Sequence, residues 1–194
     1  MMVEKYNPDI HHRRSIRLKG HDYSQAGAYF VTICAWKKEC LFGDVLEGEM
    51  KENGFGQVVQ NEWTRTAVIR PNVELDYHVV MPNHFHGIMT INECDGQSGR
   101  GVLQYAPTNC IFRSPSQTIG AIIRGFKSTV TKHINEFRKT PGLPVWQRNY
   151  YEHIIRTDDE LNRIREYIVN NPARWAEDEE NPGRAIISGA ECSR

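Results

Sequence analysis

The chain of 194 residues has few cysteines, no long apolar run and no excess of either charge. Its five cysteines are odd in number and form no Cys-x-x-Cys pair, which argues against a disulfide framework and predicts reduced thiols in a cytoplasmic protein. Because no run of about 18 apolar residues is present, we expect no membrane span. The first residues also lack the apolar core of a secretory signal.

Basic and acidic residues balance at 24 each, which argues against a protein that coats nucleic acid by bulk charge. Residues 11–19 are nevertheless strongly basic, and residues 177–180 are wholly acidic. The basic stretch is compatible with a local phosphate contact and equally with a solvated arm. We expect a basic arm over 1–22, one domain over 23–175 and an acidic, flexible tail over 176–194.

The spacing of apolar residues predicts a mixed α and β domain. Strands are expected at 28–36, 73–79, 84–91 and 150–156, and helices at 54–67, from Ser116 or Thr118 to about 137, and at 158–171. Residues 93–117 show no periodicity and are expected to form a loop insertion. The order β-α-β-β-α-β is that of the ferredoxin-like (split βαβ) fold, an antiparallel sheet with two helices on one face. The fold class is therefore α+β, with one extra helix at the C-terminal end.

The most informative segment is His84-Phe85-His86, in a predicted strand. Side chains alternate between the faces of a strand, so both imidazoles point to the same side and Phe85 points to the other. Two such imidazoles can hold one divalent metal ion, although a His-x-His pair is also an ordinary strand surface. With Phe85 toward the two helices, the histidines face the open side of the sheet, where the last helix could pack.

That last helix carries Tyr167 and Asn171, which lie one turn apart on the same face. Asn171 could supply an amide oxygen as a third ligand, and a mixed nitrogen and oxygen site suits Mg²⁺ or Mn²⁺. The alternatives are ordinary: Tyr167 as a half-buried aromatic with its hydroxyl in water, and Asn171 as a helix end before Pro172.

Several segments together resemble a known family. His84-Phe85-His86, within residues 79–88, resembles the HUH motif of single-tyrosine transposases. Further matches lie at residues 14–18, 23–32, 146–156 and 167–172. In this order, the motifs resemble those of the REP-associated tyrosine transposases, and they span residues 13 to 175.

The resemblance implies a ferredoxin-like HUH nuclease domain, a divalent metal and single-stranded DNA as the substrate. It makes His84 and His86 the metal ligands, Tyr167 the nucleophile and Asn171 the third ligand. Two further residues, Glu152 and His153, match a recurring segment of the family and could support the site from behind the ligands. Neighbouring Tyr150 and Tyr151 are rival nucleophiles, but no ligand lies one helical turn away from either.

The implied activity is that of a metal-dependent endonuclease and strand transferase, acting on hairpin DNA through a 5′-phosphotyrosyl intermediate. DNA contacts are expected from two basic groups, with solvated faces as the alternative: Arg13, Arg14, Arg17 and Lys19 in the arm, and Arg124, Lys127 and Lys132 on the long helix. Two other functions stay open, a hairpin-binding module that does not cleave and an unrelated hydrolase that uses His-x-His. We expect a cytoplasmic, nucleoid-associated monomer or homodimer, with an active site built within one chain or from two.

Overall fold

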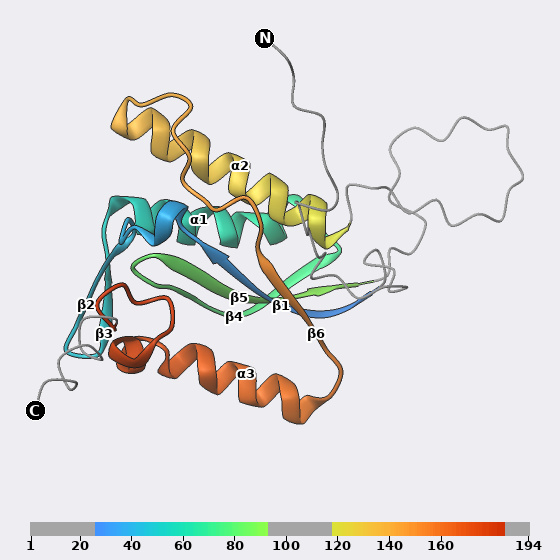
Figure 1. The fold of residues 1–194 in the computed structure, drawn as a ribbon. Coiled ribbons are helices and arrows are strands. Elements are labelled where there is room, and N and C mark those ends of the chain that lie inside the picture. Colours follow the sequence, from blue (N-terminus) through green and yellow to red (C-terminus); the bar gives the residue numbers. More distant parts are fainter. Residues whose placement is uncertain (1–25, 93–117, 185–194) are drawn as a thin grey trace, which may run out of the picture.

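The computed structural model describes residues 26–92 and 118–184 (Figure 1). The predicted arm, the 93–117 insertion and residues 185–194 lie outside the described residues. The four basic residues of the arm proposed to contact DNA are therefore not placed. Within the described parts, no helix is long and apolar enough to cross a membrane.

Four antiparallel strands form the central sheet: β1 (Gly27–Cys34), β4 (Val73–Val80), β5 (His84–Ile91) and β6 (Tyr151–Ile155). Their order across the sheet is β4-β5-β1-β6, so β1 and β5 are central and β6 is an edge. This order is the ferredoxin-like arrangement, and it confirms the predicted α+β fold class.

Helices α1 (Gly54–Ile69) and α2 (Ile119–Arg138) cover one face of the sheet, and α3 (Asp158–Asn170) covers the other (Figure 1). Each helix begins after a side-chain N-cap that accepts a backbone N–H: Asn53, Thr118 and Thr157, respectively. A proline follows α3 and the chain continues as the 3₁₀ helix η3 (Pro172–Glu177). A shorter 3₁₀ turn, η1 (Trp36–Lys38), follows β1.

The main core lies between the sheet and the α1–α2 layer. Trp63 of α1 is fully buried and packs on Phe85 of β5 and Phe126 of α2, with ring centroids 4.7 and 5.4 Å apart. A Cβ at Gly87 would lie 2.6 Å from the Trp63 ring, so the glycine allows the indole to lie directly on the sheet.

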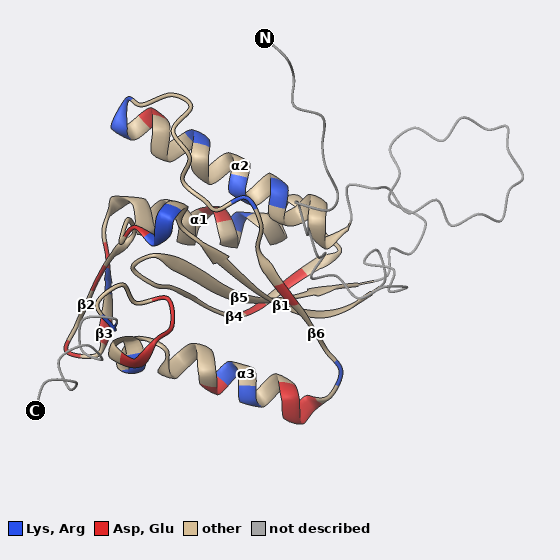
Figure 2. Cartoon of the chain, viewed as in Figure 1, with Lys and Arg blue, Asp and Glu red and all other residues tan. Residues whose placement is uncertain are grey.

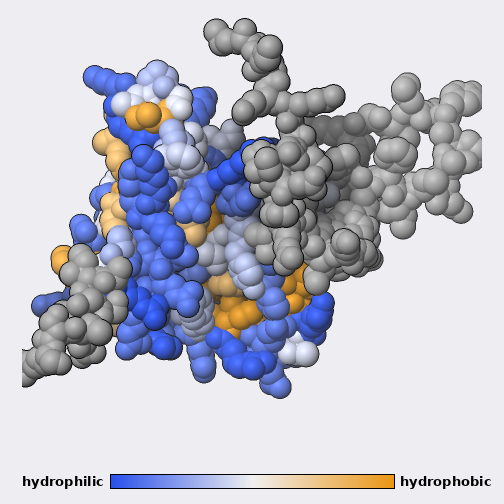
Figure 3. Space-filling view, viewed as in Figure 1, coloured by the Kyte–Doolittle hydropathy of each residue, from blue (hydrophilic) through white to orange (hydrophobic). Residues whose placement is uncertain are grey.

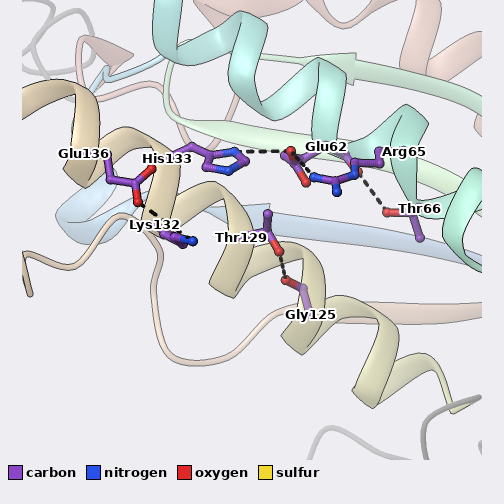
Figure 4. A network of polar contacts seen from close by, with 8 residues as sticks. All are labelled: Glu62, Arg65, Thr66, Gly125, Thr129, Lys132, His133 and Glu136. Atoms are coloured by element: carbon purple, nitrogen blue, oxygen red, sulfur yellow. Dashed lines mark hydrogen bonds and ion pairs between the residues drawn. The ribbon is translucent and has the colours of Figure 1, made fainter.

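Polar contacts also join α1 to α2 (Figure 4). His133 Nδ1 of α2 lies 3.2 Å from Glu62 Oε1 of α1, and Glu62 also faces Arg65 within its own helix. Because such partly exposed pairs contribute little to stability, the apolar contacts beneath them carry most of the packing energy.

One pair of strands was missed by the sequence prediction. Strands β2 (Gly43–Leu46) and β3 (Glu49–Glu52) form a separate hairpin between β1 and α1. Its two-residue turn, Glu47-Gly48, has φ angles of 53° and 78°, as a type I′ turn requires. The turn packs on η3, because a Cβ at Gly48 would lie 3.5 Å from Ala173. The hairpin therefore supports the chain that continues from α3.

Candidate metal and tyrosine site

His84 and His86 lie on the α3 side of β5, the face opposite to Phe85, as the alternation predicted. Both are buried, with 0% and 4% of their surface exposed, and their ring centroids are 4.5 Å apart. His86 pairs across the sheet with Thr32 of β1, and its Nδ1 lies 2.8 Å from Thr32 Oγ1. The hydrogen bond fixes the ring and directs Nε2 toward α3.

Asn83 fixes the tautomer of His84. Its amide nitrogen donates to the carbonyl oxygens of Lys38 and Glu180, at 3.1 and 2.6 Å, so its Oδ1 must face His84. This oxygen lies 2.9 Å from His84 Nδ1, which therefore carries the proton and donates it. The lone pair of His84 then resides on Nε2, the nitrogen that faces the site.

Tyr167 of α3 reaches the histidine pair within the same chain. Its hydroxyl lies 3.1 Å from His86 Nε2, and its ring meets Phe30 of β1 edge-on at 6.1 Å. The two halves of the predicted site, 81 positions apart in sequence, are thus in contact. A single chain supplies both.

Helix α3 is held on the sheet by a small apolar cluster and an ion pair. The cluster contains Phe30, Ile88, Ile155 and Ile168, with Leu161 and Ile164 of α3 at its edge. Figure 3 shows apolar side chains gathered where α3 meets the sheet. Arg165 donates to Asp76 Oδ2 of β4 through Nε and Nη2, at 3.0 and 2.6 Å, and lies over the Tyr77 ring. These contacts fix the orientation of α3 and so of Tyr167.

Asn171 ends α3 and is almost fully buried, with 3% of its surface exposed. Its amide nitrogen donates to Asp178 Oδ2 at 3.3 Å. Its Oδ1, like Nε2 of His84, is buried and accepts no hydrogen bond from the described residues. Two buried lone pairs without a donor are costly, and a cation would satisfy both. The donor set therefore fits a metal ion.

A carboxylate that the sequence prediction did not assign completes this cluster. His84, His86 and Asp178 each offer a ligand atom, and these atoms lie within 4.8 Å of one another. Asp178 follows η3, in the acidic stretch that Figure 2 shows beside the end of α3. The backbone N–H of Glu180 donates to Asp178 Oδ1 at 2.6 Å, and Asn83 holds the Glu180 carbonyl. Residues 176–180, expected to begin a flexible tail, thus contact the site.

A cavity of about 550 Å³ opens between the sheet and α3. It is lined by Phe30, Thr32, His86 and Tyr151 from the sheet, and by Tyr167, Asn171, Arg174, Glu177, Asp178, Glu179 and Glu180. Among these lining residues four are acidic, and Arg174 alone is a permanent cation. A cavity with this charge favours bound cations.

Burial sets the protonation of the site. It lowers the pKa of His84 and lowers that of His86 further, the latter with help from neighbouring His84. Both imidazoles are therefore neutral and able to bind a metal near pH 7. Burial also raises the pKa of Tyr167, and Asp178 adds to the rise, so the phenol keeps its proton. A hydrogen bond from the Asn171 side chain acts in the opposite direction and lowers the pKa of Tyr167.

The two predicted supporting residues do not reach the ligands. Glu152 lies on the α1–α2 face of β6, since it alternates with Tyr151, and it accepts a hydrogen bond from Tyr150 at 2.7 Å. His153 is on the site's face, but its Nε2 lies 2.7 Å from Glu160 Oε1, at the start of α3. It ties β6 to that helix.

The helical cations predicted to contact DNA also differ from one another. Lys127 is turned inward, and its ammonium donates to the carbonyl oxygens of Gln147, Arg148 and Asn149 at 2.6, 3.2 and 3.3 Å. Burial lowers its pKa to about 8. Lys127 therefore anchors the loop before β6. Arg124 remains exposed on α2.

Comparison with known proteins finds no matching family model. An uncharacterized protein of Haemophilus influenzae is 45% identical over 178 residues, which cover 92% of this chain and 98% of the relative. A second protein of that organism, named "Putative REP-associated tyrosine transposase", is 24% identical over 153 residues, 79% of this chain and 74% of the relative. Among solved structures, a REP-associated tyrosine transposase bound to a REP hairpin matches with a TM-score of 0.56 and 20% identity, covering 84% of this chain and 77% of that one. The structural match supports the same fold.

Proposed function

We propose that this chain is a distant member of the REP-associated tyrosine transposases and that it cleaves and rejoins single-stranded DNA next to a hairpin. One observation carries the proposal. The Tyr167 hydroxyl lies 3.1 Å from His86 Nε2, beside two buried ligand atoms, His84 Nε2 and Asn171 Oδ1, that have no hydrogen-bond donor among the described residues.

The residues present suit a divalent cation with mixed nitrogen and oxygen ligands, such as Mg²⁺ or Mn²⁺. His84, His86 and Asp178 would hold it, with Asn171 as the further oxygen donor. When bound, such an ion would polarise the scissile phosphate and offset its charge in a cavity lined by four acidic residues. The neutral imidazoles need lose no proton to bind the ion.

Tyr167 is the nucleophile of the proposed reaction. Its hydroxyl oxygen attacks the phosphorus, the bond from phosphorus to the 3′-oxygen breaks, and the chain becomes joined to the 5′-phosphate. The phenol proton passes to water as the new bond forms, and the 3′-oxygen takes up a proton from water to become a free hydroxyl. Rejoining is the reverse attack by a 3′-hydroxyl, so the energy of the phosphodiester is conserved in the phosphotyrosine.

The substrate follows from the relatives. The matched solved transposase is bound to a REP hairpin, and we propose a hairpin of this kind as the DNA for the present chain. The arm that contains Arg13, Arg14, Arg17 and Lys19, together with exposed Arg124, would contact its phosphates. The domain over residues 23–175 then requires Asp178 as well, from just beyond its predicted end.

The test is a labelled hairpin oligonucleotide incubated with the protein and Mn²⁺, followed by a denaturing gel that detects a covalent adduct. We expect an adduct with the native chain and none with Tyr167→Phe, while Tyr151→Phe, a matched tyrosine in the same cavity, retains it. His84→Ala should abolish the cleavage that depends on Mn²⁺. An adduct that survives in Tyr167→Phe contradicts the nucleophile.

The same experiment separates the alternatives. Hairpin binding by the native chain without any adduct would indicate a binding module. Turnover of a small phosphodiester that is indifferent to Tyr167→Phe would indicate an unrelated metal-dependent hydrolase.

A further inference from the structure

Three residues form a row across the site's face of the sheet. Tyr151 of β6 pairs with Thr32 of β1, and Thr32 pairs with His86 of β5. Exposure falls along the row, from 47% at Tyr151, through a partly buried Thr32, to 4% at His86. Since β6 is the edge strand, Tyr151 lies where the cavity opens and His86 lies at its inner end.

The row also sets a distance. Adjacent strands lie about 4.8 Å apart, so two strand spacings separate Tyr151 from His86 by about 10 Å. A phosphate that lies at the histidines therefore has its neighbouring sugar and base within reach of the Tyr151 ring. The base must be unpaired, because a paired base could not leave its partner to enter the cavity.

We propose that Tyr151 is a stacking platform for the unpaired nucleobase that flanks the scissile phosphate. The proposal rests on the proposed function and adds a nucleobase subsite to it. The Tyr151 ring is half exposed and lies against Phe30, whose ring centroid is 6.4 Å away at an interplanar angle of 69°. An exposed aromatic ring supported from one side is the usual platform for single-stranded bases, because every base has a face that can stack.

The loop before Tyr151 is held in place in advance. Lys127 donates to three consecutive carbonyl oxygens in this loop, those of residues 147, 148 and 149. The backbone that presents the ring is thus fixed before DNA arrives, which lowers the entropic cost of stacking.

Neither neighbouring tyrosine can take this role. Tyr150 lies on the opposite face and donates to Glu152, while the Tyr167 hydroxyl is already beside His86 Nε2. Both Tyr151 and Tyr167 line the cavity with about half of their surface exposed, but only the Tyr167 hydroxyl contacts His86, which leaves the Tyr151 ring for a base.

The experiment is a cycle between one variant and one change in the DNA. The affinity for a hairpin oligonucleotide is measured by fluorescence anisotropy in a Tyr167→Phe background, which prevents cleavage. Tyr151→Leu, which keeps an apolar side chain but loses the ring, should weaken binding about 10-fold. Tyr151→Phe, which keeps the ring, should bind like the native residue. The oligonucleotides carry a single abasic residue at successive positions beside the hairpin.

At one position, the abasic DNA should bind equally to the proteins with and without Tyr151→Leu, since the base that stacks is gone. The platform would be overturned if Tyr151→Leu weakened binding 10-fold for every abasic oligonucleotide alike, or if Tyr151→Phe weakened binding. Coupling without any covalent adduct in the native chain would contradict only the proposed cleavage. An adduct without coupling would contradict only the platform, and no binding to any hairpin would overturn both.

Discussion

The two faces of the sheet bury different kinds of side chain. The face under α1 and α2 buries mainly apolar side chains, among them Trp63, Phe85 and Phe126. The face under α3 buries His84, His86 and Asn171, next to an apolar cluster with four buried residues in the described part of the chain. Buried polar groups cost free energy unless they are partnered. The first face therefore stabilises the fold, and the second can carry unsatisfied ligand atoms because the first compensates for them.

The difference extends to the helices themselves. Helix α2 has seven buried residues over its length, whereas α3 has one, Ile168. Much of the orientation of α3 thus depends on directional contacts, such as Arg165 with Asp76 and His153 with Glu160. The helix that carries Tyr167 can accordingly be perturbed without unfolding the sheet.

The largest expected effect is on the apolar face. Trp63→Ala removes the fully buried indole between α1, Phe85 and Phe126, and we expect the free energy of unfolding to fall by about 3–5 kcal/mol. Adduct formation per folded molecule should stay unchanged, because Trp63 does not contact the site. Urea unfolding measures the first quantity, and the denaturing gel measures the second.

The matched change on the other face is Ile168→Ala, next to Tyr167. It should cost less stability than Trp63→Ala and reduce adduct formation more, since it loosens the helix that positions the nucleophile. If both variants lose adduct formation in proportion to their loss of stability, the two faces do not have separate roles in stability and activity.

The next effect concerns the hydrogen bonds behind the metal ligands. Asn83→Ala removes the acceptor that holds His84 Nδ1–H, so the Nε2 lone pair is no longer favoured. We expect the affinity for Mn²⁺ to fall about 10- to 100-fold, as is usual when the partner of a ligating histidine is lost. Calorimetric titration of Mn²⁺ checks this. The matched variant is Thr32→Val, which removes the corresponding hydrogen bond at Nδ1 of His86. An unchanged affinity for Mn²⁺ in Asn83→Ala would show that Asn83 does not set the tautomer of His84.

The same contrast explains what the sequence could reveal. Apolar periodicity predicted the strand and helix order, because each element buries one stripe or one face. The alternation in β5 placed His84 and His86 together, and the helical repeat placed Tyr167 and Asn171 together. Local geometry was sufficient for each half of the candidate site.

What the sequence did not reveal depends on tertiary contacts. Asp178 reaches the histidines only because η3 follows α3 and packs on the turn of the unpredicted hairpin at Gly48. In the sequence, Lys127 is a basic residue on the polar side of an amphipathic helix. Its contact with the carbonyl oxygens of the neighbouring loop is visible only in the folded structure. Strand alternation shows that Glu152 faces away from Tyr151. It does not show which side of the sheet that is, because this depends on the pairing of β6 with β1.

The smallest effect is a dependence of stability on pH that both faces share. Burial lowers the pKa of His78, which lies on the α1 side beside Trp63 and Gln60, as it does those of His84 and His86. The unfolded chain binds protons with an ordinary pKa of 6.5, so below that pH it holds protons that the folded histidines do not. The stabilisation is therefore complete above the unfolded pKa and is lost as the pH falls below it. Each histidine contributes at most about 1.4 kcal/mol per pH unit to this slope.

His78→Gln separates the two faces in this measurement. Urea unfolding between about pH 7.5 and pH 5 should show a slope that is smaller by up to one proton in the variant, because a glutamine side chain does not titrate. Mn²⁺ should steepen the loss of stability toward low pH in both proteins, because it binds only the neutral imidazoles on the α3 side. A variant with the native slope would show that His78 is protonated in the folded chain. An effect of Mn²⁺ that disappears with His78→Gln would show that the two faces are coupled.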